Sequence, residues 1–148
     1  MPRKLRFPFE GHYILTNDYR DHLRYSNAPG TDWALPAGTP VYAAAAGTVT
    51  WCEWGQAGGR YVIVDHGGRL LTLYSHLSWV NMVRGEDVQA GHLLGLSGST
   101  GRSVAPHLHF AVKEGGKWID PEPLLQNSHV PAQPVAKPSQ VDKYSWDE

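Results

Sequence analysis

The sequence predicts a mainly β protein, a compact antiparallel sheet or sandwich built from short strands with little helix. The first observation is the frequency of residues that interrupt regular secondary structure: 16 glycines and 11 prolines divide the chain of 148 residues into short segments. The second is composition, because the segments between them are rich in Val, Thr, Tyr and Trp, which are enriched in strands. The third is spacing, since these runs follow one another too closely for the crossover helices of βαβ units.

The totals exclude several classes of protein. A chain of 148 residues is long enough for one domain with one hydrophobic core, and its 41% hydrophobic and 18% charged residues are a globular composition. The formal charge of −1 provides no basic surface for nucleic acid. No apolar run approaches the roughly 18 residues that cross a bilayer, so no membrane insertion is expected. We expect a monomer.

Two further features bear on the compartment. Cys52 is the only cysteine, which excludes an intrachain disulfide, and we expect it to pack as a small hydrophobe. The basic start of the chain is not followed by an apolar stretch, so no signal peptide is predicted.

The N-terminal part of the chain has little pattern. Residues 1–27 are predicted to be a segment that packs on the main domain or leads into it. Within it, residues 16–22 are polar without a clean period and predict a loop. The run Asn27-Ala28-Pro29-Gly30 predicts a turn.

From Thr39 onward the sequence predicts strands separated by turns. Glycine pairs at 58–59 and 67–68 separate β-rich runs, as in hairpins. The alanines at 43–46 do not predict a helix, because Pro40 and Gly47 leave too little length between them. After residue 125 the chain has prolines, few apolar residues and no period, so residues 126–148 predict a linker or disordered tail. The expected strands are residues 40–44, 47–51, 61–65, 70–76, 93–97, 107–113 and 118–119.

His107 and His109 are the first candidates for chemistry. On a strand, residues two apart face the same side about 6–7 Å apart, so one imidazole can bind a metal while the other handles protons. An isolated pair of this kind is more often two polar residues on an exposed face. Asp32 follows a turn, where an Asp usually caps or accepts a hydrogen bond, and His76 ends an apolar strand. The glycine-rich loop at 95–102 is not a P-loop, because it lacks the Gly-Lys-Ser/Thr ending and a following helix.

Five segments together resemble the lysostaphin-like, LytM-type zinc endopeptidases. They occur in the order and at the spacings of that family, and the resemblance extends over residues 28–125, which we take as the peptidase domain. The segments are DWALPAGTPVYA at 32–43, VDHG at 64–67, LYSHL at 73–77, GLSGSTG at 95–101 and PHLHF at 106–110.

The resemblance implies an antiparallel β domain of the LytM (duplicated hybrid motif) type, with a groove that holds one Zn²⁺. These enzymes hydrolyse peptide bonds in the stem or cross-bridge of bacterial peptidoglycan. Two of the family's metal ligands match Asp32 and His109, and its two catalytic histidines match His76 and His107. Zinc lowers the pKa of a bound water, which such histidines orient or deprotonate while they stabilise the oxyanion. His66 is expected to be structural; the remaining histidines are expected at the surface, namely His12, His22, His92 and His129.

One position departs from the family pattern. The first ligand should precede Asp32 by four residues, but Ala28 stands there and its methyl group cannot bind zinc. The chain is then an engineered inactive variant, or a neighbour substitutes, or the domain is degenerate and acts by binding. Asn27 offers an amide oxygen, and His22 reaches the site if the preceding loop folds back.

The sequence therefore supports two main functions. The first is a zinc-dependent peptidoglycan endopeptidase acting on the cell wall, in an extracellular or periplasmic location. Without a signal peptide, it would be a phage-type, antibacterial lysin or a trimmed chain whose tail led to a wall-binding module. The alternative is a catalytically silent LytM-type module that binds or activates in cell-wall hydrolysis. A third possibility is a structural tail or virion component with a vestigial fold.

Overall fold

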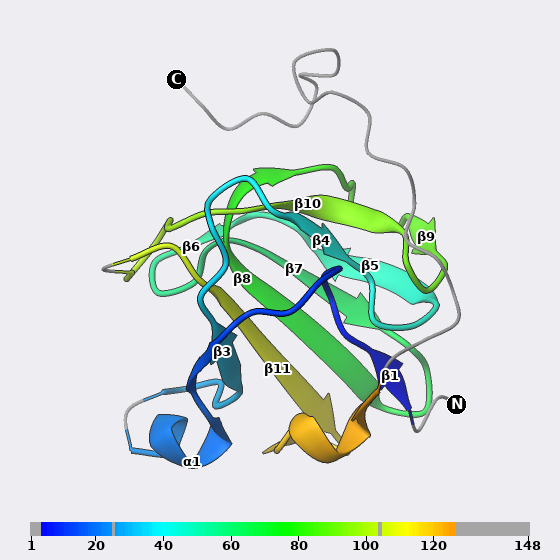
Figure 1. Cartoon of the computed structure of the whole chain (residues 1–148). Coiled ribbons are helices and arrows are strands. Elements are labelled where there is room, and N and C mark those ends of the chain that lie inside the picture. The colour runs from blue at the N-terminus through cyan, green and yellow to red at the C-terminus, as the bar shows by residue number, and fades with distance from the viewer. Residues whose placement is uncertain (1–3, 25, 104, 127–148) are drawn as a thin grey trace.

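The protein is described by a computed structural model that covers residues 4–24, 26–103 and 105–126 (Figure 1). The predicted fold class is confirmed, because antiparallel strands dominate this part of the chain. The single α-helix in it has four residues, and none of its helices is long and apolar enough to cross a membrane. The helical elements are α1 (Tyr19–His22) and the 3₁₀ turn η1 (Glu122–Leu124). The strands are β1 (Leu5–Arg6), β2 (Leu15–Asn17), β3 (Thr31–Trp33), β4 (Pro40–Tyr42), β5 (Gly47–Trp51), β6 (Trp54–Gly55), β7 (Gly59–Asp65), β8 (Leu70–Val80), β9 (Asp87–Val88), β10 (Leu93–Ser97), β11 (Leu108–Glu114), β12 (Lys117–Ile119) and β13 (Leu125–Gln126).

The main sheet has the strand order β2-β3-β11-β8-β7-β5-β9. Strands β4, β6, β10 and β12 attach beside this path, and β1 pairs with β13 in a separate parallel ribbon. In Figure 1, β8 and β11 run side by side through the centre of the molecule, while β4 and β10 cross above them. Val41 of β4 and Leu94 of β10 belong to the same buried core as Tyr74 and Phe110, so these two strands contribute to the core.

Strand β8 changes partners at His76. It pairs with β11 up to Ser75 and with β10 from Leu77 onward. Between them His76 has a φ of 67°, in the left-handed region that non-glycine residues rarely adopt and that is often found at functional sites. The expected strand end at this residue is wrong, because β8 continues to Val80 with a different neighbour.

The core lies on one face of β7, β8 and β11. Phe110 lies opposite Tyr74 across the β11–β8 pairing, with ring centroids 5.3 Å apart, and both side chains are fully buried. Because alternate residues of a strand face opposite sides, His109 lies on the other face from Phe110. The sheet therefore has an apolar side for the core and a second side for polar groups.

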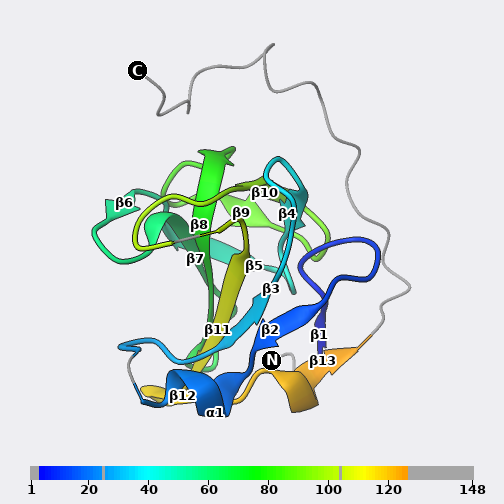
Figure 2. The same ribbon diagram turned by 60° about the vertical axis from the view of Figure 1, so that its left-hand side comes forward.

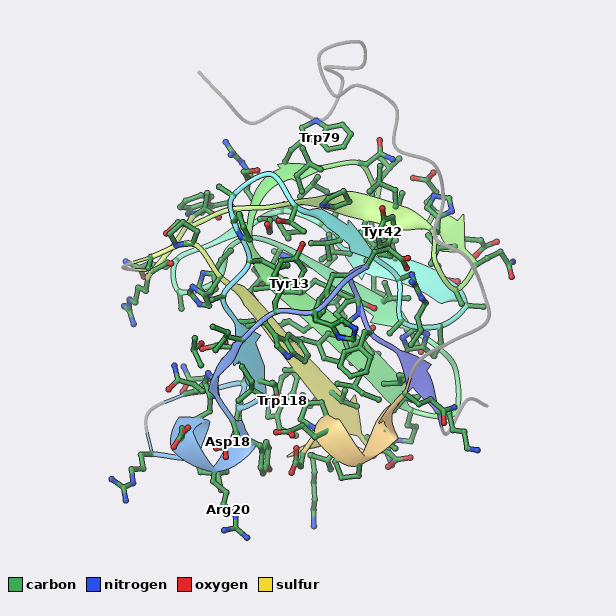
Figure 3. All side chains as sticks on the ribbon, viewed as in Figure 1. Tyr13, Asp18, Arg20, Tyr42, Trp79 and Trp118 are labelled. Carbon is green, nitrogen blue, oxygen red and sulfur yellow. The ribbon has the colours of Figure 1, made fainter. Side chains whose placement is uncertain are left out.

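The expected loop at residues 16–22 is wrong. It contains the end of β2 and all of α1, whose first turn is closed by a capping box between Asp18 and Asp21. The helix lies beside β12 (Figure 2), where the Tyr19 hydroxyl donates to the Trp118 carbonyl at 2.8 Å. Figure 3 shows Asp18 at this helix and Arg20 pointing away from the body of the protein. The strand β3 was also not predicted.

The structure also bears on several smaller expectations. Cys52 is buried, as expected for a small apolar residue. His12 is exposed and His92 half-buried, whereas His129 and nearly all of the predicted tail lie outside the described residues. The division into an N-terminal segment, a peptidase domain and a tail stays a prediction.

Candidate metal centre

The pairing of β3 with β11 places Asp32 beside His109. These two residues are direct partners in the register, and their neighbours Thr31 and Phe110 pair on the core side. The carboxylate and the imidazole therefore leave the sheet on the same face. The distance from His109 Nδ1 to Asp32 Oδ1 is 2.8 Å.

His22 joins this pair from helix α1. Its Nε2 lies 3.1 Å from Asp32 Oδ2, and its ring centroid lies 4.7 Å from that of His109. The residue is only 4% exposed, so the expectation that His22 is a surface residue is wrong. Asn17 Nδ2, on β2, donates to the same oxygen of Asp32 at 3.4 Å.

Main-chain carbonyl groups fix the orientation of both imidazoles. His22 Nδ1 lies 2.8 Å from the Asp18 carbonyl oxygen, and His109 Nε2 lies 2.7 Å from that of Ala28. A carbonyl only accepts, so each of these nitrogens carries a hydrogen and donates it. The other nitrogen of each ring is the one that faces Asp32. Metal-binding histidines are typically oriented in this way by a carbonyl on the far nitrogen.

The three side chains fit a zinc ion. In the part of the chain that the structure describes, His22, Asp32 and His109 form the one group of His, Cys, Asp or Glu with ligand atoms all within 4.8 Å. Zinc–nitrogen and zinc–oxygen bonds of about 2.0–2.1 Å in a tetrahedron put neighbouring ligand atoms about 3.3–3.4 Å apart. His22 Nε2 lies 3.1 Å from Asp32 Oδ2 and His109 Nδ1 lies 2.8 Å from Asp32 Oδ1, so both nitrogens face the same carboxylate at a distance close to this value. Three protein ligands with a fourth position open are typical of catalytic zinc.

The charges in this cluster agree with a cation site. Burial raises the pKa of Asp32, but hydrogen bonds from His109 and His22 outweigh it and bring that pKa well below its ordinary value. The carboxyl group is therefore ionised throughout the physiological range. Burial alone lowers the pKa of His22, but its hydrogen bonds to Asp32 and the Asp18 carbonyl raise it overall.

His76 and His107 lie next to this cluster. Their ring centroids are 4.4 Å apart, and His76 lies 6.3 Å from His109 by the same measure. His107 Nε2 is 4.0 Å from Asp32 Oδ2. The structure thus brings together Asp32, His76, His107 and His109, the four residues that the sequence singled out.

The catalytic candidates are also held by carbonyl groups. His76 Nδ1 donates to the Thr100 carbonyl at 2.7 Å, and His107 Nδ1 donates to the Ala105 carbonyl at 2.9 Å. In both rings the opposite nitrogen is the one left for chemistry. Burial lowers the pKa of His76 to about 4, so its ring is neutral at pH 7 and its Nε2 can accept a proton.

Sequence reasoning missed the residues that support the site. Thr100 fixes His76 through its carbonyl, and its hydroxyl donates to the Leu77 carbonyl at 2.7 Å while accepting from the Arg60 amide at 3.1 Å. The loop at 98–101 therefore positions a histidine. The role of Asp18 in α1 had a signal, the Asp-x-x-Asp spacing of a capping box. No sequence signal indicated that the Ala28 carbonyl would contact His109. Asn27, one of the two predicted substitute ligands, has an exposed side chain.

Comparison with protein families gives a clear assignment. The model of peptidase family M23 matches residues 26–121, about two thirds of the chain. The matched part contains Asp32, His76, His107 and His109, whereas His22 lies before it.

Curated relatives are named as peptidoglycan enzymes. The chain is 38% identical over 150 residues to the peptidoglycan DD-endopeptidase ShyA of Vibrio cholerae, covering 93% of this chain and 35% of that protein. It is 37% identical over 117 residues to the DD-carboxypeptidase/endopeptidase Mpg of Neisseria meningitidis, covering 79% of this chain and 25% of that protein. The chain thus spans about a third or less of these relatives.

Solved structures show the same fold. The catalytic domain of the antimicrobial peptidase lysostaphin from Staphylococcus simulans is 32% identical, with a TM-score of 0.66 over 75% of this chain and 90% of that domain. A zinc-containing peptidase from Vibrio cholerae is 31% identical, with a TM-score of 0.69 over 80% of this chain and 38% of that one. Together with the family match, these likenesses confirm the lysostaphin-like resemblance: the chain belongs to peptidase family M23.

Proposed function

We propose that this chain is a zinc-dependent endopeptidase that hydrolyses peptide bonds of bacterial peptidoglycan, in the stem or the cross-bridge. One observation carries the proposal. Four imidazoles surround the ionised Asp32, and each has one nitrogen bonded to a main-chain carbonyl and the other left for the centre. Such preorganisation suits metal-assisted hydrolysis. Relatives named as peptidoglycan DD-endopeptidases support the choice of substrate.

The residues of the site have separate proposed roles. Asp32 and His109 hold the metal. Zinc, when bound, acts as a Lewis acid that lowers the pKa of a water and polarises the scissile carbonyl. His76, neutral and with Nε2 as acceptor, takes the proton of the attacking water. His107, the more exposed of the pair at 19%, orients that water and stabilises the oxyanion.

The proposed place of action follows from the substrate. Peptidoglycan lies outside the cytoplasmic membrane, so the enzyme would act in an extracellular or periplasmic location. We expect it to act as a monomer on wall peptides. Release from a phage, and antibacterial use as an endolysin, stay predictions.

Cleavage of purified walls tests the proposal. The zinc-loaded chain is incubated with sacculi that carry direct stem cross-links and, separately, with walls that carry glycine bridges, and the released peptides are identified by mass spectrometry. We expect new amino termini from one wall type and a loss of about 100- to 1,000-fold in rate for His107→Ala. The proposal is wrong if the zinc-loaded chain releases no more peptide from either wall than this variant does.

A catalytically silent binding module is the second candidate. Ala28 favours it, because the family's first ligand is missing there. This module would co-sediment with sacculi, release no peptides, and keep its binding after His76 and His107 are both replaced by alanine. If those replacements abolish a measured cleavage, the binding-only function is excluded.

A further inference from the structure

We propose that His22 is the third metal ligand, and that this chain has moved the ligand lost at position 28 onto helix α1. The inference rests on the proposed metal chemistry. It concerns which side chain completes the site, and it makes residues 15–24 part of the metal centre.

Position 28 still contributes to the site, but through its backbone. The Ala28 carbonyl accepts a hydrogen bond from His109 Nε2 at 2.7 Å, which directs His109 Nδ1 to Asp32. A carbonyl on the far nitrogen is an orienting contact and not a ligand. The chain therefore retains Ala28 in a supporting role and needs a third donor from elsewhere.

His22 is that donor by position and by orientation. Its Nε2 lies 3.1 Å from Asp32 Oδ2 in the same buried cluster as His109, with Nδ1 held by the Asp18 carbonyl. The other nearby candidates differ. Asn17 presents its amide NH₂ to Asp32, so it supports the carboxylate and does not offer an oxygen. Asn27 has an exposed side chain.

The segment that carries His22 is anchored on both sides of the ligand. Before it, β2 pairs with β3, with Asn17 opposite Asp32 itself. Within the helix, the Tyr19 hydroxyl donates to the Trp118 carbonyl at 2.8 Å. These contacts fix α1 against the sheet, so His22 does not depend on a mobile loop to reach the site. The whole segment lies before residue 26, where the family match begins.

Moving the ligand back to position 28 tests the inference. Three proteins are compared: the unaltered chain, His22→Ala, and the double variant His22→Ala/Ala28→His. Bound zinc is measured by elemental analysis, its affinity by chelator competition, and its imidazole ligands by X-ray absorption at the zinc edge. Loss of residues that only support a zinc ligand costs about 10- to 100-fold in affinity, so His22→Ala should lose at least that much.

The expected results are specific. The unaltered chain binds one zinc with two imidazole ligands, His22→Ala loses most of its zinc, and the double variant recovers it. Asn27→Ala and the exposed His12→Ala serve as matched controls and should keep full affinity. Circular dichroism with chelator present shows whether each variant is folded, and His22→Gln provides a second variant if His22→Ala is not.

Other results overturn the inference. Undiminished zinc affinity in folded His22→Ala excludes His22 as a ligand, and loss of zinc in Asn27→Ala assigns the third ligand to Asn27. An unaltered chain that binds no zinc also contradicts it. The proposed function fails separately: a chain that binds zinc through His22 but cleaves no wall refutes the endopeptidase and leaves the ligand assignment standing.

Discussion

The half-buried histidine His66 differs from the buried histidines of the metal centre, His22 and His109, in the partner of its second ring nitrogen. His66 Nδ1 donates to the Ala46 carbonyl at 2.7 Å, and its Nε2 accepts from the Thr72 hydroxyl at 2.8 Å. The Thr72 oxygen accepts from the Tyr74 hydroxyl at 2.7 Å, and the Tyr74 oxygen accepts from the Ala44 amide at 2.9 Å. Every donor in this series meets an acceptor, so the network is complete with neutral side chains.

The histidines of the metal centre share the first of these contacts with His66 but not the second. His22 and His109 also donate one N–H to a carbonyl, but their other nitrogens face the ionised carboxylate of Asp32. A ring nitrogen without hydrogen and a carboxylate oxygen are both acceptors, so a proton or a metal ion must lie between them. Burial of a histidine therefore indicates little by itself. The informative feature is whether its second nitrogen finds a neutral donor or another acceptor.

Replacing Asp32 with Asn should make the metal centre resemble the His66 network. The amide group offers a donor where the carboxylate offered only acceptors, and it removes the charge that attracts a cation. We expect Asp32→Asn to lose at least about 100-fold in zinc affinity and with it all measurable hydrolysis. Without metal, its free energy of unfolding should fall, because the lowered pKa of Asp32 means that the ionised carboxylate stabilises the fold at neutral pH. Chelator competition and urea denaturation measure the two effects, and unchanged zinc affinity in this variant would contradict the comparison.

His76 should affect catalysis without affecting the metal. It lies beside the cluster but outside the group of three ligand atoms, with a pKa of about 4 that keeps Nε2 available as a base at pH 7. We expect His76→Gln to lower kcat by about 100- to 10,000-fold while bound zinc stays unchanged. Parallel measurements of turnover and zinc content check this. Loss of zinc in that variant would place His76 among the ligands instead.

Much of this centre could be predicted because its signals are local. Asp32, His76, His107 and His109 lie in short motifs whose order identifies the family, and several strands are bounded by glycine pairs. The contact of His22 with Asp32 had no such signal, because α1 is only four residues long and is held by distant contacts. A helix this short has little intrinsic stability, and its position depends on tertiary packing.

The predictions of strand boundaries were wrong for a similar reason. Strand β3 has three residues and exists because it pairs with β11, almost eighty residues later in the chain. The extension of β8 beyond His76 depends on a second partner, β10. Local propensity does not contain such pairings, so the sequence predicted the apolar runs better than it predicted where strands end.

Tyr74→Phe should weaken the His66 network and leave the metal centre unchanged. The change keeps the ring that packs on Phe110 but removes the hydroxyl, which leaves the buried Ala44 amide without its acceptor. Leaving a buried donor unsatisfied costs about 1–3 kcal/mol in the free energy of unfolding. Zinc affinity and hydrolysis should not change, because none of these atoms touches the metal centre. Urea denaturation beside a zinc titration separates the two, and a drop in zinc affinity would show that the regions are coupled.

The smallest effect concerns the pH dependence of stability in the metal-free protein. Burial lowers the pKa of His66 below its ordinary value of 6.5, so the unfolded chain takes up this proton at a higher pH than the folded one. The stability that neutral His66 contributes is therefore fully present above about pH 6.5 and is lost as the pH falls below it. Urea denaturation between pH 7.5 and 5, with chelator present, should show a shallower loss for His66→Gln than for the unaltered chain. Equal slopes would mean that protonation of His66 is not what weakens the fold in acid. The His66 network would then tolerate a positive charge on this ring.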